Sequence, residues 1–338
     1  METGRPRRVT QRDVARLAGV SQTTVSMVLS GASAPSLPTE TLERVQAAVR
    51  ELGYVPNRFA QALKTNRTMT IACVVPDIAN PFYPSLLRGV QSVADDAGYD
   101  VITVNTDGTA EREQRFLSWC LERRVDGVVG VFFTLRAADF QPLTDSEIGV
   151  VRIESSAKRG GPLPVDNLYI DNEAAAGAVT RYLIGRGYRR IAMIAGIGGP
   201  QDGRIRGYRS ALIEAGREPL IVTDEAFTEE GGQRAAETLF ALAERPDALF
   251  AANDLMAIGA MAAAREAGFS VPGDIAVAGF DDIFAARLVT PPLTTVSQFQ
   301  YDLGTTAAEV LLDRLQRGNA GAGTSQAMPF RLIERGST

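Results

Sequence analysis

The 338-residue chain contains no histidine, two cysteines and a single tryptophan. Without histidine, the Ser-His-Asp and Cys-His arrangements that activate most hydrolytic nucleophiles are excluded, and so is a His/Cys metal site. Cys73 lies in an apolar, strand-like run and Cys120 in a helical pattern, so both are expected to pack in cores and not to form a disulfide. The composition predicts a protein that is not an enzyme and holds no metal or cofactor.

Long hydrophobic runs are also missing. No stretch approaches the 18 apolar residues of a membrane-spanning helix, and Arg5, Arg7 and Arg8 stand where a signal peptide would need apolar residues. A chain of 338 residues with 45% hydrophobic content is too long for one ordinary domain and predicts two or three. We therefore expect a cytoplasmic, multidomain protein without membrane contact.

Positive charge is scarce overall but concentrated at the N-terminus. Residues 1–67 contain ten lysines and arginines against five acidic residues, a net charge of +5, whereas the whole chain carries −5. A basic segment attracts phosphate groups, and the acidic remainder is repelled by them. The asymmetry predicts that the N-terminal part alone contacts nucleic acid.

The segment from Val9 to Ser30, VTQRDVARLAGVSQTTVSMVLS, has the pattern of two short crossing helices. Apolar residues recur at helical spacing, one glycine permits a tight turn, and a serine is placed to cap the second helix. These residues are Val14, Leu17, Ala18, Gly19, Ser21, Val25, Val28 and Leu29. The opposite face of the second helix carries Gln22, Thr23, Ser26 and Met27, which suit base edges in a major groove. This pattern predicts a DNA-binding helix-turn-helix.

A third helix is predicted from Thr39 to Leu52. Its apolar stripe consists of Leu42, Val45, Ala48, Val49 and Leu52. Gly53 ends this helix, and beyond the next proline Asn57 caps a short segment, RFAQALK. That segment is too short to be a stable helix alone, so we expect it to fold only when paired with its own copy or against DNA. The predicted units are an all-α headpiece, residues 1–56, and a hinge with its linker, residues 57–68.

From Met69 onward, short β-branched runs alternate with amphipathic helices, as in IACVVP, VITVN and GVVGVFF. The βαβ pattern restarts with a helix near Asn172 and continues through IAMIAG, ALFAAND and IAVAGFDD. It predicts an α/β core of two lobes, each with a doubly wound parallel sheet, and a cleft at the carboxyl ends of the strands. The predicted N-terminal lobe comprises residues 69–167 and 299–325, and the C-terminal lobe residues 168–298 and 326–338.

Through nearly its whole length the chain resembles the lactose/galactose repressor (LacI/GalR) family of bacterial transcription regulators. The resemblance is carried by DVARLAGVSQTTVS, LGYVPNRFAQAL, IANPFYPSLLRG, RIRGYRSAL, AANDLMAIGA, AGFDD and PPLTTV, in the family's order and at its separations. It implies a homodimer whose hinge helices pair in the minor groove of a pseudo-palindromic, double-stranded operator. It also implies a periplasmic-binding-protein-like core that holds a small-molecule effector. No leucine heptad follows MPFRLIERGST, so we expect a dimer and not a tetramer.

The resemblance implies DNA contacts for residues of the second helix and of the hinge. Gln22 and Thr23 match the first base-contacting positions, and the neighbouring hydroxyl residues match positions that hold phosphates or support the base contact. The implied DNA-contacting residues are Ser21, Gln22, Thr23, Thr24, Ser26, Met27, Asn57, Ala60 and Leu63.

Met27 departs from the family pattern, because many members have an arginine there that pairs with guanine. A thioether offers only apolar contact, such as to a thymine methyl group, or else it merely covers the helical bundle. Leu63 matches the leucine that the family inserts between central base pairs, an apolar wedge that unstacks a base step. The operator half-site is therefore expected to differ from the common one.

Six core residues match the family's ligand-binding positions: Phe82, Tyr83, Glu154, Arg204, Asn253 and Asp281. A carboxylate accepts from two hydroxyls, arginine donates in a fork, an amide does both, and an aromatic ring covers the apolar face of a sugar. The resemblance therefore implies a sugar or sugar derivative held across the cleft. The alternative is that Arg204 and Asp281 form an interlobe ion pair without a ligand.

Together these features predict a sequence-specific DNA-binding repressor whose operator affinity is controlled by a small effector. An enzyme would need an activated nucleophile, a metal cluster or a cofactor loop, and an exported solute-binding protein would have no use for a basic headpiece. The remaining alternative is the same regulator gated by a partner protein. A ligand-induced rise in thermal stability distinguishes a metabolite effector from a protein partner.

Overall fold

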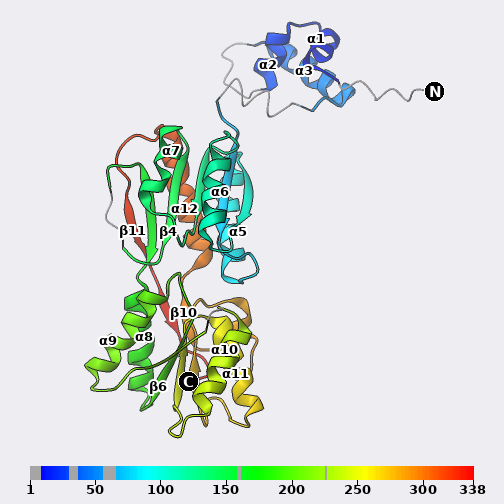
Figure 1. The fold of residues 1–338 in the computed structure, drawn as a ribbon. Helices are drawn as coiled ribbons and strands as arrows, with labels where there is room; N and C mark the ends of the chain where they lie inside the picture. The colour runs from blue at the N-terminus through cyan, green and yellow to red at the C-terminus, as the bar shows by residue number, and fades with distance from the viewer. Residues whose placement is uncertain (1–8, 30–36, 56–65, 158–160, 225–226) are drawn as a thin grey trace, which may run out of the picture. The chain divides into compact units, whose positions relative to one another are not determined.

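The computed structural model describes residues 9–29, 37–55, 66–157, 161–224 and 227–338. The chain divides into two units, Met1–Thr68 and Met69–Thr338. The first unit is helical and the second is an α/β core (Figure 1). The division falls at the residue where the sequence predicts the linker to end. Within the described residues, no helix is long and apolar enough to cross a membrane.

The N-terminal unit contains α1 (Gln11–Ala18), α2 (Gln22–Leu29) and α3 (Thr39–Leu52). Gly19 and Gly53 follow α1 and α3 with φ values of 66° and 58°, a left-handed conformation that glycine adopts without a Cβ clash. Ser21 caps α2, because its Oγ accepts a hydrogen bond from the Thr24 amide at 3.0 Å. The three helices and their ends agree with the sequence prediction.

The core of this unit is small and aliphatic. It consists of Val14, Ala15, Ala18, Val25, Val45 and Ala48, with Val28 and Leu29 packed against it. The expectation that Leu17 belongs to this core is wrong, since its side chain is 46% exposed. Ala15 is buried in its place, because the buried face of α1 follows the spacing from Val14 to Ala18 and leaves residue 17 at its margin.

The N-terminal lobe of the core is a six-stranded parallel sheet with strand order β11-β5-β4-β3-β1-β2. Its strands are β1 (Thr70–Val75), β2 (Asp100–Asn105), β3 (Gly127–Gly130), β4 (Gly149–Glu154), β5 (Val165–Ile170) and β11 (Ser325–Met328). Its helices are α5 (Phe82–Asp96), α6 (Ala110–Cys120), η1 (Ala137–Phe140), α7 (Gln141–Asp145) and α12 (Gln300–Gln316). Because helices cover both faces, the central strands are almost continuously apolar.

Alternate strand residues of this lobe enter two separate cores. Cys73 and Val129 pack with α5 and α12, whereas Ala72 and Val128 pack with α6 and α7. Cys73 and Cys120 are both buried and form no disulfide, and burial raises the pKa of each thiol to about 12. Both cysteines are therefore inert packing residues, as the sequence predicts.

The C-terminal lobe is a four-stranded parallel sheet with strand order β7-β6-β8-β9. Its strands are β6 (Ile191–Ala195), β7 (Leu220–Thr223), β8 (Ala248–Ala251) and β9 (Ala276–Ala278). Its helices are α8 (Asn172–Gly185), α9 (Gln201–Glu214), α10 (Glu229–Phe240), α11 (Asp254–Glu266) and η2 (Phe284–Arg287). The antiparallel pair β10 (Thr295–Ser297) and β12 (Arg331–Ile333) adjoins this lobe, so MPFRLIERGST does contain the predicted last strand.

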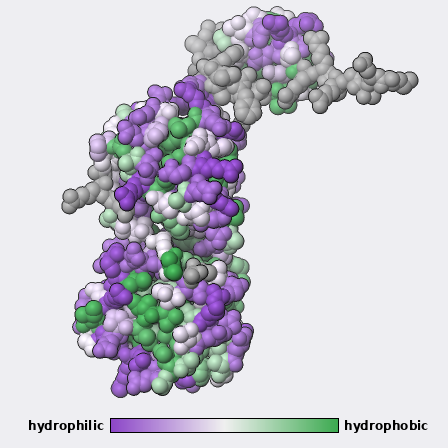
Figure 2. Space-filling view, viewed as in Figure 1, coloured by the Kyte–Doolittle hydropathy of each residue, from purple (hydrophilic) through white to green (hydrophobic). Residues whose placement is uncertain are grey.

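The chain passes between the lobes after β5, before α12 and after β11 (Figure 1). The predicted boundaries after residues 167 and 325 lie inside β5 and β11, which stay in the N-terminal sheet through Ile170 and Met328. Those two crossings come a few residues later than predicted, because β5 and β11 pair with each other as far as these residues. On the visible face of the core, hydrophilic residues predominate over the upper lobe, whereas hydrophobic residues gather among hydrophilic ones on the lower lobe (Figure 2).

Candidate functional site

The second helix of the headpiece presents a mixed polar face. Gln22, Thr23 and Met27 are exposed, whereas Thr24 and Ser26 are half-buried. Met27 is 40% exposed, so a large part of this residue is not covered by the helical bundle. This face therefore offers an amide, hydroxyl groups and an apolar tip to a DNA groove.

The remaining predicted DNA-contacting residues divide between the cap of this helix and the hinge. Ser21 Oγ lies 2.9 Å from Thr24 Oγ1, so these two hydroxyls are engaged with each other at the start of α2. Asn57, Ala60 and Leu63 lie outside the described residues.

A cavity of about 990 Å³ lies between the two lobes of the core. All six predicted effector residues line it, at the carboxyl ends of the strands where the sequence places the cleft. The N-terminal lobe contributes Phe82, Tyr83 and Glu154, and the C-terminal lobe contributes Arg204, Asn253 and Asp281. The fold thus brings together residues that are almost 200 positions apart in the sequence.

Arg204, on α9, is the most extensively held side chain of the cavity. Its Nε donates to Asn172 Oδ1 at 2.8 Å, its NH1 donates to the Ala252 carbonyl, and its guanidinium lies 3.7 Å from the centroid of the Phe280 ring. Its NH2 lies 3.5 Å from Oδ1 of Asp281. Arg204 and Asp281 belong to the same lobe, so the alternative of an interlobe ion pair is wrong and the pair is internal to the C-terminal lobe.

Asp281 has an unusual backbone conformation and an unusual acidity. Its φ of 123° lies in a region that residues with a side chain rarely adopt, and such strain is concentrated at functional sites. Its Oδ1 accepts a hydrogen bond from Gln298 Nε2 at 2.6 Å. Burial raises the pKa of Asp281 to about 7, against the opposing charge of Arg204 and with a contribution from the carboxylate of Asp254. Near neutral pH this carboxyl group can therefore change its charge.

Asn253 caps α11 and also holds part of the cavity wall. Its Oδ1 accepts from the Met256 amide at 2.8 Å, and its Nδ2 donates to the Phe227 carbonyl at 3.1 Å. An amide nitrogen carries two hydrogens, so one donor remains beyond these bonds. The residue is thus a structural cap that keeps one amide donor for a ligand.

Two aromatic rings at the start of α5 form the wall opposite the C-terminal lobe. Phe82 and Tyr83 meet edge to face, with ring centroids 5.2 Å apart. Tyr83 is buried, and burial raises the pKa of its hydroxyl group, which therefore stays protonated. Such a wall suits the apolar face of a sugar ring.

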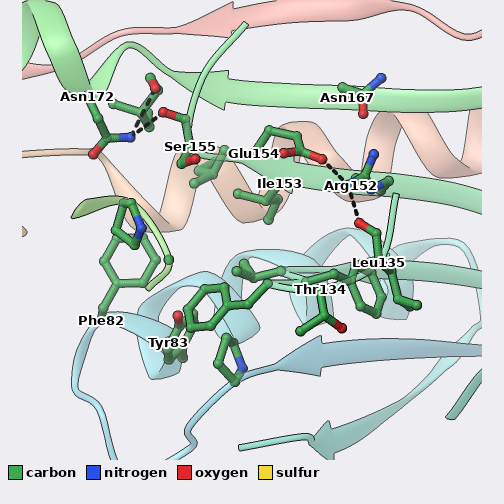
Figure 3. A pocket seen from close by; sticks show the side chains of 18 of the residues that line it. Phe82, Tyr83, Thr134, Leu135, Arg152, Ile153, Glu154, Ser155, Asn167 and Asn172 are labelled. Atoms are coloured by element: carbon green, nitrogen blue, oxygen red, sulfur yellow. Dashed lines mark hydrogen bonds and ion pairs between the residues drawn. The ribbon is translucent and has the colours of Figure 1, made fainter. Parts of the chain in front are cut away.

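The end of the cavity along β4 contains a second buried ion pair, between Arg152 and Glu154 (Figure 3). Arg152 NH2 also donates to the Leu135 carbonyl at 2.9 Å, and burial lowers the pKa of the guanidinium, opposed chiefly by Glu154. At the other end, Asn172 Nδ2 donates to the Ser155 carbonyl at 2.8 Å. Asn172 therefore links the C-terminal lobe, through Arg204, to the end of β4.

Sequence reasoning missed Arg152, Asn167, Asn172 and Gln298, which all line the cavity. A signal for Arg152 was present, because alternation along β4 puts residues 152 and 154 on the same face. No comparable signal marks Asn167 or Gln298, whose positions depend on the pairing of strands distant in sequence.

Each of the two units matches a known protein family. A family model described as "Bacterial regulatory proteins, lacI family" matches residues 10–57, and one described as "Periplasmic binding protein-like domain" matches residues 180–338. The ribose operon repressor of Escherichia coli (strain K12) is 37% identical over 336 residues, covering 97% of this chain and 99% of that protein.

Solved structures agree over the same length. The Lac repressor dimer bound to operator and the anti-inducer ONPF has a TM-score of 0.86 at 28% identity, covering 98% of this chain and 99% of that chain. A complex of the transcriptional regulator CelR with cellobiose has a TM-score of 0.71 at 33% identity, covering 98% of this chain and 100% of that chain.

Proposed function

The chain belongs to the lacI family of bacterial regulatory proteins and is a DNA-binding transcriptional repressor, and we propose that an uncharged sugar in its interlobe cavity controls its affinity for operator DNA. The observation that carries this proposal is the balance of charge in the cavity. Each buried arginine is paired with its own carboxylate, Arg204 with Asp281 and Arg152 with Glu154. A charged ligand would have to disrupt one of these pairs, whereas hydroxyl groups can bond to both members.

The aromatic and amide groups around these pairs support the same ligand class. Phe82 and Tyr83 offer an apolar wall, and Asn253 offers an amide. A small polyol is bound by this combination of aromatic and polar groups. Among the similar proteins, CelR was solved with cellobiose, and the Lac repressor with the anti-inducer ONPF. The predicted effector residues Phe82, Tyr83, Glu154, Arg204, Asn253 and Asp281 form this proposed site.

For the DNA, we propose a pseudo-palindromic operator bound by a homodimer, as in the Lac repressor structure, which is a dimer bound to operator. A symmetric dimer reads two half-sites with the same residues. Gln22 and Thr23 would contact base edges, with Ser21, Thr24 and Ser26 at phosphates, while Met27 would face an apolar group such as a thymine methyl. Leu63, with Asn57 and Ala60 beside it, would enter the minor groove as the wedge.

The test uses the full chain in two steps. First, binding sites are selected from a random pool of double-stranded DNA, and the preferred site is expected to be a pseudo-palindrome. Second, the operator Kd is measured by fluorescence anisotropy with neutral sugars and with their phosphorylated or carboxylated forms. We expect a neutral sugar to change the operator Kd by about 5- to 150-fold, the usual range of allosteric coupling, and its charged form to have no effect.

A charged metabolite acting in place of the neutral sugar would contradict the proposed ligand class. If no metabolite changes either the operator Kd or the thermal stability of the protein, control by a partner protein replaces the proposal.

A further inference from the structure

An aromatic ring of the N-terminal lobe reaches the C-terminal lobe. Phe133 follows β3, and both Phe133 and Gly199, which precedes α9 in the other lobe, line the cavity. A Cβ added at Gly199 would lie 3.0 Å from Cζ of Phe133. Since a Cβ stands about 1.5 Å from its Cα, Cζ and the Cα of Gly199 are at most about 4.5 Å apart, which is contact distance. The tip of the ring therefore touches the opposite lobe.

The base of the same ring lies on its own lobe. A Cβ added at Gly108, between β2 and α6, would lie 2.6 Å from Cδ2 of Phe133. Gly108 and Gly199 both have a φ of 61°, a left-handed conformation, and both lack the Cβ that would displace the ring. The ring thus lies between a glycine of each lobe, and we call these three residues the interlobe contact.

A buried carboxylate fixes the loop that carries Phe133. Glu113, on α6, is fully buried, and its side chain accepts hydrogen bonds from three successive backbone amides. The donors are the amides of Phe133 at 2.7 Å, Thr134 at 3.0 Å and Leu135 at 3.1 Å. Hydrogen bonds to a carboxylate are strong, and burial keeps water from competing for them. The N-terminal lobe therefore holds Phe133 in place by itself.

The residue before Phe133 anchors the loop a second time. Phe132 is buried in the core of this lobe, and its ring meets that of Phe140 edge to face, with centroids 4.9 Å apart. Phe133, by contrast, is 41% exposed. A ring that is held firmly on one lobe while its tip touches the backbone of the other loses that contact when the lobes separate.

From these observations we propose that the interlobe contact stabilises the lobe arrangement of this structure and thereby sets the operator affinity of the ligand-free protein, with Glu113 as the residue that positions Phe133. This inference rests on the proposed function only in taking the lobe arrangement to control operator affinity. When the lobes separate, the tip of the ring leaves Gly199 and enters water, whereas the hydrogen bonds of Glu113 are kept. The contact thus biases an equilibrium between lobe arrangements without any ligand.

The first experiment tests whether the contact exists in solution. The full chain is made with the photo-crosslinking residue p-benzoylphenylalanine in place of Phe133 and is irradiated without ligand or DNA. We expect a crosslink to the tryptic peptide 191–204, which contains Gly199, and mass spectrometry identifies it. Crosslinks confined to peptides of the N-terminal lobe would overturn the inference, because the ring would then not reach the other lobe.

The second experiment measures the ligand-free operator Kd of the full chain by fluorescence anisotropy, with the site selected from random DNA. Phe133→Ala should change this Kd by about 3- to 30-fold, the range over which single residues alter coupling between sites. Leu242→Ala is the matched control, because Leu242 is an apolar side chain of similar exposure, 37%, that lies outside the cavity. Its operator Kd should stay within about twofold of the wild-type value.

The positioning role of Glu113 is tested in a double-variant cycle. Glu113→Gln replaces one acceptor oxygen by a donor, which cannot accept from the loop amides, so the loop that carries Phe133 must move. The operator Kd should change in the same direction as in Phe133→Ala, and combining the two substitutions should add nothing further. Additive changes would overturn the role of Glu113. The Phe133→Ala result stands whether or not Glu113→Gln folds.

The remaining outcomes separate this inference from the proposed function. An unchanged ligand-free operator Kd in Phe133→Ala overturns the inference even if sugar binding weakens, because the ring would then act only on a ligand. An equal change in Leu242→Ala overturns it as well. If Phe133→Ala alone changes this Kd but no neutral sugar changes it in the wild type, the inference stands and the proposed function fails.

Discussion

Asp281 has both an unusual backbone conformation and a titratable charge in the wall of the cavity. It combines a strained backbone, a hydrogen bond from Gln298 and an ion pair with Arg204, all at a buried position in the cavity wall. Burial raises its pKa to about 7, so both charge states are populated near neutral pH. A ligand whose hydroxyls donate to this carboxylate favours the ionised form.

The first prediction follows from this acidity. Below pH 7 the proton on Asp281 must leave before hydroxyls can donate to it, so effector binding should weaken as the pH falls and level off above about pH 7. We expect the sugar Kd to be about tenfold higher at pH 6 than at pH 8, because a carboxyl group with a pKa of about 7 is ionised in about a tenth of the molecules at pH 6 and in about nine tenths at pH 8. Isothermal titration calorimetry between pH 6 and pH 8 measures this Kd.

The control for this titration is Asp281→Asn, which removes the titrating group. Its sugar Kd should be higher than that of the wild type and independent of pH. A wild-type Kd that stays constant from pH 6 to pH 8, or falls on acidification, would show that the ligand does not bond to an ionised Asp281.

Met27 is the residue with the clearest consequence for DNA specificity. It is exposed on α2, where its thioether can make only apolar contacts. Met27→Arg introduces a fork of donors, and we expect the selected half-site to change toward guanine at one position, with a preference of about 1–3 kcal/mol. Selection from a random duplex pool measures this preference. Gln46→Arg is the control, because it adds the same charge to an exposed position of α3 and should leave the selected sequence unchanged.

An unchanged selected half-site in Met27→Arg would mean that residue 27 does not face the bases. A general gain of affinity for all DNA, equal to that of Gln46→Arg, would lead to the same conclusion.

At the scale of elements, the N-terminal lobe depends on the close crossing of α5 and α12. A Cβ added at Gly304 would lie 2.1 Å from the Leu86 carbonyl oxygen, and one at Gly89 would lie 2.2 Å from that of Tyr301. The backbones of the two helices therefore meet without intervening side chains. The helix α12 begins two residues after Gln298, which lines the cavity and bonds to Asp281.

The third prediction concerns this crossing. Gly304→Ala should lower the free energy of unfolding by about 1–3 kcal/mol, the usual cost of overpacking, because the helix backbones must separate. Gly185→Ala, at the end of α8 with open space around it, is the control and should be neutral or stabilising by up to about 1 kcal/mol. Urea unfolding of both variants measures the difference. Equal stability of the two variants would mean that the crossing can adjust without cost.

Helices and strands could be predicted from the sequence because their signals are local. The stripe from Thr39 to Leu52 and the caps at Gly19 and Ser21 involve neighbouring residues, and the structure shows them as predicted. Lobe boundaries were less accurate, because the ends of β5 and β11 are set by pairing with each other across the fold.

The same distinction explains the candidate site. The six predicted effector residues lie around one cavity. Five of them stand in motifs that the sequence shows directly: Phe82 and Tyr83 in IANPFYPSLLRG, Arg204 in RIRGYRSAL, Asn253 in AANDLMAIGA and Asp281 in AGFDD. Asn167 could not be predicted, because its place depends on its register with Arg152. The burial and strain of Asp281 could not be predicted either, because they arise from contacts that a linear sequence does not contain.

At the scale of the whole molecule, the charge differs between the part proposed to bind DNA and the part proposed to bind the effector. The basic N-terminal part suits phosphates, and the acidic remainder contains a cavity in which each buried arginine is paired with a carboxyl group. The cavity is walled by residues of both lobes, so a ligand that contacts both walls favours one arrangement of the lobes over others. A ligand can control operator affinity only if it favours one arrangement of the lobes in this way.

The most direct test of this account is a calorimetric titration of the full chain with its tightest-binding uncharged sugar, without DNA and with saturating operator. Coupling between two sites is reciprocal, so the sugar Kd must change by the same factor by which the sugar changes the operator Kd. We predict a change of about fivefold or more with operator and none with a random duplex of equal length. A sugar Kd that is identical with and without operator would contradict the account.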